Sequence, residues 1–262
     1  TRMKAAILQS RSDIDPAVNA AMLAQSIAQA KAQGADMLFS PELVGCLDRN
    51  RTRAADNLRS EAEDIALAGA REAAARHGIW VHVGSLGVRD ERSDGRWVNR
   101  SFVIDDRGEI RVRYDKIHLF DVDLPSGESW RESSVYGPGE AVVAVDTPWA
   151  RIGLSICYDL RFPDLYRALS DAGANVLLVP AAFTVPTGEA HWHLLLRARA
   201  VEASAFVIAP AQAGQHADGR TTYGHSLVID PWGKVLLDMG DDPGLTCVEL
   251  DFAVIYLPEQ IG

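Results

Sequence analysis

The stretch Phe102-Val-Ile-Asp-Asp-Arg-Gly-Glu-Ile110 predicts a β-hairpin, because two apolar segments flank a polar turn in which Gly108 supplies backbone freedom. Much later, the stretch Leu227-Val-Ile-Asp-Pro-Trp-Gly-Lys-Val235 repeats the layout of Val-Ile-Asp, two residues, Gly, one residue and a β-branched residue. A hairpin that recurs in this way suggests a chain built from two similar halves. We therefore expect each half to combine strand–helix units with one hairpin.

Apolar and amphipathic segments alternate on both sides of these hairpins. Short buried strands are predicted at 3–9, 37–40, 79–84, 151–156, 176–179 and 206–210. Helices are predicted from an Asp15-Pro16 cap to Gly34, from a Ser60–Glu63 capping box to His77, after Phe162 and around 189–202. This pattern favours an α/β fold in which two sheets face each other with helices outside. Since no Pro- or Ser-rich linker interrupts the chain, we predict a single domain over residues 1–262.

The composition argues against several classes of partner. The net charge is −10 and the Lys and Arg residues are scattered, so no basic patch suits a phosphate backbone and nucleic acid is not expected as a partner. No apolar run approaches the ~18 residues of a membrane span, and the first residues show no cleavable signal pattern. We therefore expect a cytoplasmic protein with no membrane partner.

Cys157 is the first candidate for chemistry. The three cysteines, Cys46, Cys157 and Cys247, are far apart and form no Cys-x-x-Cys pair, so reduced thiols are expected. Cys157 follows the apolar segment 151–156 and precedes a predicted helix. A strand-to-helix turn exposes a side chain beside free backbone N–H groups, which suits a nucleophile. The competing interpretation is a buried apolar cysteine, the more common role of a free thiol.

Two further strand ends carry charged side chains. Glu42 follows Phe39-Ser-Pro at the carboxyl end of a predicted strand, where open α/β sheets place their ligands, although alone it could be a solvated loop carboxylate. Lys116 comes just after the first hairpin, among apolar and aromatic residues that could desolvate its ammonium group. The alternative is a surface lysine paired with Asp115 or Asp121. Taken together, separate strand ends present a thiol, a carboxylate and an ammonium.

Three motifs around these residues resemble the signatures of the nitrilase superfamily of carbon–nitrogen hydrolases, in the family's order. They are Phe39-Ser-Pro-Glu42, Asp115-Lys-Ile-His-Leu-Phe120 and Ile156-Cys-Tyr-Asp-Leu-Arg-Phe-Pro163. The similarity continues through 187–192, 197–200, 223–226 and 230–233. This resemblance implies a four-layer αββα sandwich and a homodimer or higher homo-oligomer that pairs through an outer helical layer.

The resemblance also implies roles for individual residues. Glu42 matches the family's general base, Lys116 its oxyanion lysine and Cys157 its nucleophile. Glu132 matches a further glutamate that many members place beside the lysine, although it could also be an ordinary loop acid. For the oxyanion we expect a second donor, the backbone N–H of Tyr158.

Attack by Cys157 requires its proton to reach Glu42. With unperturbed pKa values of about 8.5 and about 4.3, this transfer is unfavourable by roughly 6 kcal/mol. We expect the Lys116 ammonium to stabilise thiolate and burial to raise the pKa of the carboxylate, so that the two pKa values approach each other. Glu42 then protonates the leaving amine, and water hydrolyses the thioester.

Histidines offer an alternative base and possible metal ligands. His118 could act as the base of a Cys–His pair. We instead favour a packing or hydrogen-bonding role for His118, as for His191 and His225. His191 and His193 resemble metal ligands, yet a helical spacing of two makes them face different directions. Because no third ligand is evident, we predict no metal, and we expect no cofactor.

The detailed resemblance is to the branch of ω-amidases and deaminated-glutathione amidases, through Lys116 to Pro125. It implies as substrate a small-molecule amide that bears a carboxylate, for which Arg161 or Arg49 could supply the local cation. Aromatic side chains that could line the pocket are Phe120, Trp130, Tyr158 and Phe183.

Other activities stay open within the same family. The same triad serves nitrilases, N-carbamoyl-amide hydrolases and glutaminases that supply a synthetase, and a non-catalytic interaction protein could retain the sandwich. The chain closes at 257–262 without the basic segment that relatives pack across their dimer. In addition, the Arg- and Asp-rich loop 44–58 differs from typical ω-amidases, so dimer geometry and substrate preference are both open.

Overall fold

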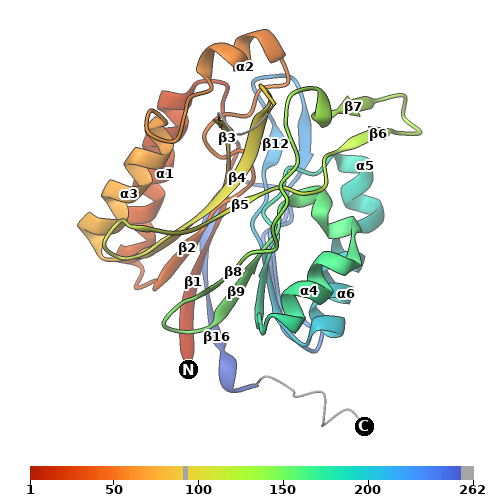
Figure 1. Cartoon of the computed structure of the whole chain (residues 1–262). Coiled ribbons are helices and arrows are strands. Elements are labelled where there is room, and N and C mark those ends of the chain that lie inside the picture. The colour runs from red at the N-terminus through yellow and green to blue at the C-terminus, as the bar shows by residue number, and fades with distance from the viewer. Residues whose placement is uncertain (91–93, 255–262) are drawn as a thin grey trace.

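The computed structural model describes residues 1–90 and 94–254, and within them two six-stranded sheets lie face to face (Figure 1). Helices α1 (Pro16–Ala32) and α3 (Ile65–His77) cover the outer face of one sheet. Helices α4 (Pro163–Asp171) and α6 (His193–Ala203) cover the other. The predicted four-layer αββα sandwich is therefore confirmed.

The two sheets repeat one topology. The first has the order β16 (Gly244–Asp251), β1 (Arg2–Gln9), β2 (Met37–Phe39), β3 (Trp80–Arg89), β4 (Trp97–Ile104), β5 (Ile110–Asp115). The second has the order β8 (Ala144–Asp146), β9 (Arg151–Leu154), β10 (Val176–Leu178), β11 (Phe206–Ala209), β14 (Leu227–Ile229), β15 (Val235–Asp238). In each, three central parallel strands have an antiparallel strand on one side and an antiparallel hairpin on the other.

The repeated hairpin motif occupies equivalent places in the two sheets. Strand β4 pairs with β5, and β14 pairs with β15. Each pairing shifts register at the same point of the motif, between Val103 and Ile104 in one and between Val228 and Ile229 in the other. A bulge at this position sharpens the local twist. The predicted relation between the two halves is thus seen in the topology.

Side-chain alternation along the strands builds two cores. On β1, Ala5 and Ile7 face the second sheet, whereas Ala6 and Leu8 face α1 and α3. Both faces of the strand are buried, which explains why it is continuously apolar in sequence. Each fully buried Ile or Leu contributes about 1.5–3 kcal/mol from burial.

Helix ends follow the predictions with one exception. The Asp15 side chain accepts a hydrogen bond from Ala17 N (2.9 Å), and Gly34 follows the end of α1 with a φ of +81°. For α3, Ser60 does contact Glu63, but the pair closes a turn ahead of the helix. The helix begins after Asp64, whose carboxylate accepts from Leu67 N, so the predicted start at Ser60 is wrong.

Shorter elements complete the fold. They are α2 (Arg51–Asn57), β6 (Asp121–Asp123), β7 (Ser129–Arg131), η1 (Glu132–Ser134), η2 (Cys157–Arg161), α5 (Val185–Thr187), the π-helical turn η3 (Gly188–Trp192), β12 (Ala213–Gln215), β13 (Thr221–Tyr223) and η4 (Phe252–Val254). Most of them lie at the end of the sandwich that carries α2 and β7, whereas η4 lies beside the N-terminus at the opposite end (Figure 1). Among the described residues, no helix has both the length and the apolar character that crossing a membrane requires. The chain end at 257–262, on which the expectation about dimer packing rested, lies outside the described residues.

Candidate active site

Glu42 is positioned by a close approach of two backbones. After β2, the Ser40 hydroxyl donates to His82 O (2.9 Å) and accepts from Gly84 N (3.0 Å), which holds the segment against β3. A Cβ atom on Gly84 would lie 2.0 Å from Ser40 O, so only glycine permits this approach. Leu43, next to Glu42, has a φ of +51°. The chain therefore turns sharply where the glutamate leaves the sheet.

Lys116 is held in a comparable way at the end of β5. Its N–H donates to Asn99 O (2.9 Å), and its carbonyl accepts from Gly139 N (2.8 Å). A Cβ atom on Gly139 would lie 2.0 Å from Asp115 O. The buried Arg100 guanidinium forms two hydrogen bonds with the Asp115 carboxylate, at 2.6 and 2.9 Å. Lys116 thus leaves a firmly anchored backbone.

Cys157 is the first residue of η2 and has a φ of +49°, a conformation that non-glycine residues adopt at a cost. Its N–H donates to Pro180 O (2.9 Å), and Asp159 N donates to Ile156 O (3.0 Å). Between them, the Tyr158 N–H has no acceptor among the described residues. The sharp turn after β9 thus presents a thiol next to a free amide hydrogen, as the sequence predicted.

The buried Asp159 ties the Lys116 segment to the Cys157 turn. Its carboxylate accepts hydrogen bonds from the Tyr114 hydroxyl (2.6 Å) and from His118 N (3.0 Å) on one side. On the other side it accepts from Ile156 N (2.9 Å). Tyr114 and His118 belong to the Lys116 segment, whereas Ile156 belongs to the Cys157 turn, which is remote from it in sequence. The position of the lysine relative to the thiol is therefore fixed through one carboxylate.

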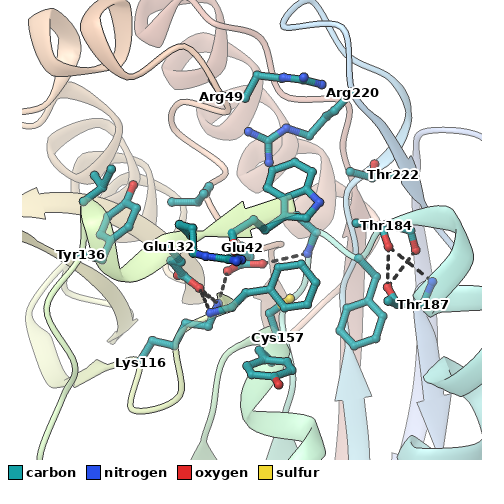
Figure 2. Close-up of a pocket in the computed structure, with 18 of the residues that line it drawn as sticks. Glu42, Arg49, Lys116, Glu132, Tyr136, Cys157, Thr184, Thr187, Arg220 and Thr222 are labelled. Atoms are coloured by element: carbon teal, nitrogen blue, oxygen red, sulfur yellow. Dashed lines mark hydrogen bonds and ion pairs between the residues drawn. The ribbon is translucent and has the colours of Figure 1, made fainter. Parts of the chain in front are cut away.

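The four predicted catalytic side chains converge on one cavity (Figure 2). Lys116 Nζ lies 3.1 Å from Glu42 Oε1 and 2.9 Å from Glu132 Oε2. Cys157 lines the same cavity and is 8% exposed, while Glu42 is 4% and Lys116 2% exposed. The alternatives of a solvated Glu42 and of a surface Lys116 do not agree with this geometry. Glu132 is likewise an ion-pair partner of the lysine.

Burial and the neighbouring charges set the protonation states. Burial disfavours the ammonium, but the carboxylates of Glu132 and Glu42 outweigh it and raise the pKa of Lys116 well above its usual value. Burial and the negative charge of Glu42 likewise raise the pKa of the Cys157 thiol, and the opposing effect of Lys116 is smaller. Lys116 does lower the pKa of the thiol, as expected, but burial and Glu42 outweigh it, so the site favours the neutral thiol.

Two partners of Glu42 were missed by the sequence analysis. The Asn99 side-chain amide donates to Glu42 Oε1 (3.0 Å) and, at 3.4 Å, to Glu132 Oε1. Ala182 N donates to Glu42 Oε2 (2.9 Å). Asn99 leaves no distinct signal because its strand also carries Arg100 and Ser101, and Ala182 leaves none because it acts through its backbone N–H. Both carboxylate oxygens of Glu42 are thereby fixed.

The cavity has a volume of about 420 Å³, and aromatic side chains line much of it. Phe120, Trp130, Tyr158 and Phe183 all face it, as the sequence predicted. The Phe120 ring packs edge-on against Tyr158, with 5.1 Å between ring centroids. The Trp130 indole N–H is buried without a partner among the described residues. The cavity therefore combines an apolar wall with an unused hydrogen-bond donor.

Cations surround the cavity as well. Both arginines named from the sequence, Arg161 and Arg49, line it, and Arg161 donates to His191 Nδ1 (2.8 Å). Arg220 also lines it, next to the Trp130 ring (5.3 Å) and paired with Asp218 (2.7 Å). Sequence reasoning missed Arg220, Arg51 and Arg131, because a loop, the start of α2 and a short hairpin bring these residues to the cavity.

The histidines have the hydrogen-bonding and packing roles that were predicted. His118 Nδ1 lies 2.7 Å from Asp159 Oδ1, and the ring stacks on Phe162 with centroids 3.8 Å apart. His191 contacts Arg161, as described above. His225 Nδ1 lies 2.9 Å from Asp238 Oδ1. A Cys–His pair therefore has no support from the contacts of His118.

An αββα sandwich with cysteine, glutamate and lysine side chains around one cavity is the arrangement expected of the nitrilase superfamily. The family model for carbon–nitrogen hydrolases matches residues 4–257. A deaminated glutathione amidase from Rattus norvegicus is 39% identical over 97% of this chain and 79% of its own length. The chain therefore belongs to the carbon–nitrogen hydrolase family.

Two further relatives extend this comparison. A deaminated glutathione amidase from Yersinia enterocolitica is 48% identical over 63% of this chain. The crystal structure of the C. elegans NitFhit protein superposes with a TM-score of 0.89 at 36% identity over 97% of this chain. The matched part spans 58% of the Yersinia protein and 62% of the C. elegans chain.

Proposed function

We propose that this chain hydrolyses the amide bond of a small carboxylate-bearing amide through a thioester on Cys157. The single observation that carries the proposal is the Lys116 ammonium, held between Glu42 and Glu132 in the cavity that Cys157 also lines. A cation fixed beside a thiol and a carboxylate provides a nucleophile, a proton acceptor and an electrostatic site for a developing oxyanion.

The first chemical step couples sulfur attack to proton transfer. Because the resting Cys157 is a thiol, its proton passes to Glu42 as sulfur attacks the carbonyl carbon. The carbonyl oxygen becomes an oxyanion between the Lys116 ammonium and the Tyr158 N–H. Fixed donors of this kind contribute about 3–4 kcal/mol each to transition-state stabilisation. Glu132 keeps the lysine charged and oriented throughout.

The second step releases the amine and then the acid. Protonated Glu42 transfers its proton to the leaving nitrogen as the carbon–nitrogen bond breaks, which leaves an acyl group on Cys157. Water then attacks the thioester carbonyl while Glu42 accepts a proton from it. Glu42 passes that proton to sulfur as the carbon–sulfur bond breaks, which releases the acid and regenerates the thiol and the carboxylate. Asn99 and Ala182 hold the carboxylate in place for these transfers.

For the substrate we propose the deaminated-glutathione or ω-amide class. Relatives that match most of this chain are named deaminated glutathione amidases. Arg161 and Arg49 on the cavity supply cations for a substrate carboxylate, which a protein of net charge −10 otherwise repels. The Trp130 indole N–H is a further donor for a polar group of the substrate.

A matched substrate panel tests this proposal. The purified protein is incubated with deaminated glutathione, a short α-keto ω-amide, the corresponding nitrile and an N-carbamoyl amine, and products are identified by mass spectrometry. We expect turnover of one or both amides and an acyl adduct on Cys157 at early times. Preferential turnover of the nitrile or carbamoyl compound would replace the proposed reaction with that alternative. Absence of turnover together with an unreactive Cys157 would support a non-catalytic role.

Replacing Cys157 by Ala removes the nucleophile and is expected to lower turnover of the preferred amide by at least ~10⁴-fold. The control is the thermal melting temperature of the variant, which should stay close to that of the wild type because a small buried side chain is replaced by a smaller one. Residual activity near the wild-type rate would exclude Cys157 as nucleophile.

We further infer that residues 1–262 act as one cytoplasmic domain that pairs as a homodimer or a higher homo-oligomer. The match of the family model from residue 4 to 257 supports the single domain. Two exposed apolar side chains on α6, Leu194 (66% exposed) and Val201 (52%), support pairing through the outer helical layer. Trp232 (62% exposed), in the turn between β14 and β15, adds a third exposed apolar side chain. Light scattering of the wild type and of Leu194→Glu tests it, since a dimer through this layer should dissociate in the variant.

A further inference from the structure

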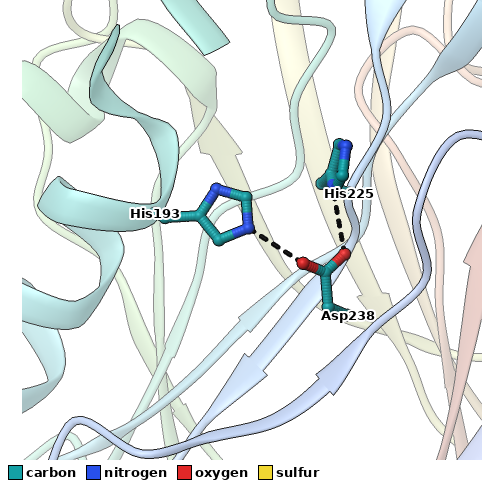
Figure 3. A group of neighbouring side chains, drawn as sticks. All are labelled: His193, His225 and Asp238. Carbon is teal, nitrogen blue, oxygen red and sulfur yellow. Dashed lines mark hydrogen bonds and ion pairs between the residues drawn. The ribbon is translucent and has the colours of Figure 1, made fainter. Parts of the chain in front are cut away.

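Outside the cavity, two imidazoles and a carboxylate form a second group of ionisable side chains, which we term the histidine–aspartate cluster (Figure 3). His193 opens α6, His225 lies between β13 and β14, and Asp238 ends β15. His193 Nε2 lies 2.9 Å from Asp238 Oδ2, and His225 Nδ1 lies 2.9 Å from Asp238 Oδ1. One ligand atom from each residue falls within 4.8 Å of the others. Three separate segments thus bring these donors together.

The backbone holds the cluster in place without any ligand. His225 N donates to Gly240 O (2.7 Å), and His225 O accepts from the Trp192 indole N–H (2.8 Å). Gly240 N donates to Asp238 Oδ1 (3.0 Å). The Tyr223 ring stacks on the His225 ring, with centroids 4.5 Å apart. The three donor side chains therefore start from fixed positions.

The charge of the cluster suits a divalent cation. Although burial opposes it, hydrogen bonds from His193, Gly240 and His225 lower the pKa of Asp238, so this residue is a carboxylate near neutral pH. Asp241 Oδ1 lies 3.1 Å from His225 Nε2 and adds a second carboxylate at the edge of the cluster. Imidazole nitrogens with carboxylate oxygens are ligands that Zn²⁺ and neighbouring d-block cations prefer.

We propose that the histidine–aspartate cluster binds one Zn²⁺ ion through a ring nitrogen of His193, a ring nitrogen of His225 and a carboxylate oxygen of Asp238. The sequence predicted no metal because His191 and His193 diverge and no third ligand was evident. His191 does turn away, toward Arg161, but the fold supplies two other partners for His193 from segments remote in sequence. The reason for expecting no metal therefore does not hold at His193.

Binding requires only small side-chain movements. Donor atoms around tetrahedral Zn²⁺ at bond lengths near 2.0–2.1 Å lie about 3.4 Å apart, so no pair of ligand atoms in the cluster has to approach by more than about 1.4 Å. The side chains are 25–36% exposed, which leaves them room to rotate. Water or Asp241 completes the coordination. The metal replaces the protons that now link each imidazole to Asp238, so binding releases protons.

The bound ion would join α6 to β15 at the outer surface of the second sheet. His193 directly follows Trp192, whose ring packs against Phe183 of the cavity wall with centroids 4.7 Å apart. The site therefore stabilises the layer that supports one side of the cavity, and it takes no part in acyl transfer.

Calorimetric titration of metal-free protein with Zn²⁺ tests the proposal. The variants are His193→Gln and Asp238→Asn, and His77→Gln on the opposite helical layer is the matched control. We expect saturable binding of one equivalent by the wild type and by the control, weakened at least ~10-fold in each cluster variant. Zn²⁺ should also raise the melting temperature of the wild type and the control but not of the cluster variants.

Cobalt spectroscopy separates this site from the cysteines, because thiolate ligands give an intense near-ultraviolet charge-transfer band that nitrogen and oxygen ligands lack. Co²⁺ bound without this band supports the histidine–aspartate cluster. Absence of saturable Zn²⁺ binding to the wild type would overturn the proposal, as would equal binding by both cluster variants or a thiolate band at one equivalent of Co²⁺. The melting temperatures without metal show whether each variant is folded.

Discussion

The cavity and the outer surface of the second sheet each hold a group of three ionisable side chains, but with opposite exposure. Lys116, Glu42 and Glu132 lie in the interior, where the lysine side chain is 2% exposed. In the histidine–aspartate cluster, the side chains of His193 and Asp238 are 36% and 35% exposed. Both groups are assembled from three separate segments. The comparison shows that exposure to water sets how strongly the charged side chains of a group depend on each other for stability.

In the interior, the Lys116 ammonium stabilises both carboxylates, and the carboxylates stabilise the ammonium. Removing one partner of a buried ion pair leaves an uncompensated charge and typically destabilises a protein by about 3–5 kcal/mol. At the surface, water replaces a lost partner, and exposed ion pairs contribute about 0–1 kcal/mol. The buried group is consequently rigid and suited to one reaction, whereas the exposed group can exchange protons for a metal. Four single substitutions and one double variant test this contrast.

Lys116→Ala should have the largest effect on both activity and stability. We expect kcat to fall by at least ~100-fold, because the oxyanion loses its cation. We also expect the free energy of unfolding at neutral pH to fall by about 3–5 kcal/mol, because Glu42 and Glu132 are left as two buried carboxylates. Steady-state kinetics and urea unfolding measure the two quantities.

The double variant Lys116→Ala/Glu132→Gln separates these effects. Removing one carboxylate relieves the repulsion, so much of the stability should return while kcat stays low. If the double variant is as unstable as the single one, the charges do not depend on each other in the way proposed. If Lys116→Ala retains the wild-type kcat, the lysine has no oxyanion role.

His82 carries a buried imidazole, which can be compared with the partly exposed imidazoles of His193 and His225. Burial lowers its pKa from about 6.5 to about 3, so the folded protein keeps it neutral while the unfolded chain takes up a proton below about pH 6.5. The stabilisation that comes from keeping His82 neutral is therefore fully present above pH 6.5. As pH falls toward 3, the free energy of unfolding decreases on this account by about 1.4 kcal/mol per pH unit.

His82→Gln removes this titration. The difference in unfolding free energy between wild type and variant should shrink by about 2 kcal/mol from about pH 7.5 to about pH 5, because other titrating groups cancel in the difference. Urea unfolding at both pH values measures it. A difference that does not change with pH would mean that His82 is protonated in the folded protein.

Asn99→Ala tests whether the buried group needs a neutral partner as well as charges. Loss of the hydrogen bond to Glu42 Oε1 should lower kcat by about 10-fold, which corresponds to about 1.4 kcal/mol, and should change KM little. An unchanged kcat would show that Ala182 alone holds the base.

Asp238→Asn in metal-free protein should have the smallest effect. Its partners His193 and His225 remain partly solvated, so the free energy of unfolding should fall by less than about 1 kcal/mol at neutral pH. Urea unfolding in the presence of a chelator measures it. A loss as large as that of Lys116→Ala would mean that exposure does not distinguish the two groups.

The fold was largely predictable because its signals are local. Gly108 and Gly233 mark the two hairpins, and the apolar strands are continuous because both of their faces are buried. The start of α3 was mispredicted because Ser60 and Asp64 are both capping residues, and only the path of the chain selects between them. A short window of sequence does not show which of two nearby capping residues begins the helix.

The candidate site was predictable to a lesser degree. Glu42, Lys116 and Cys157 were found because they end strands and lie in motifs that resemble a family. Asn99 and Arg220 were missed because nothing near them in sequence indicates which side of a strand or loop they face. The raised pKa of the Cys157 thiol was also missed, because it depends on burial and on a carboxylate that is distant in the chain.

By itself, the sequence determined the two related halves, the element types and the residues at the strand ends, since propensity and periodicity act over a few residues. Only the tertiary structure decided how charges are shared: which carboxylates surround Lys116, which partners hold Glu42, and that His193 meets His225 and Asp238. The physical reason is that electrostatic interactions depend on distance and burial in space. Both are set when the sheets pack, between residues that are far apart along the chain.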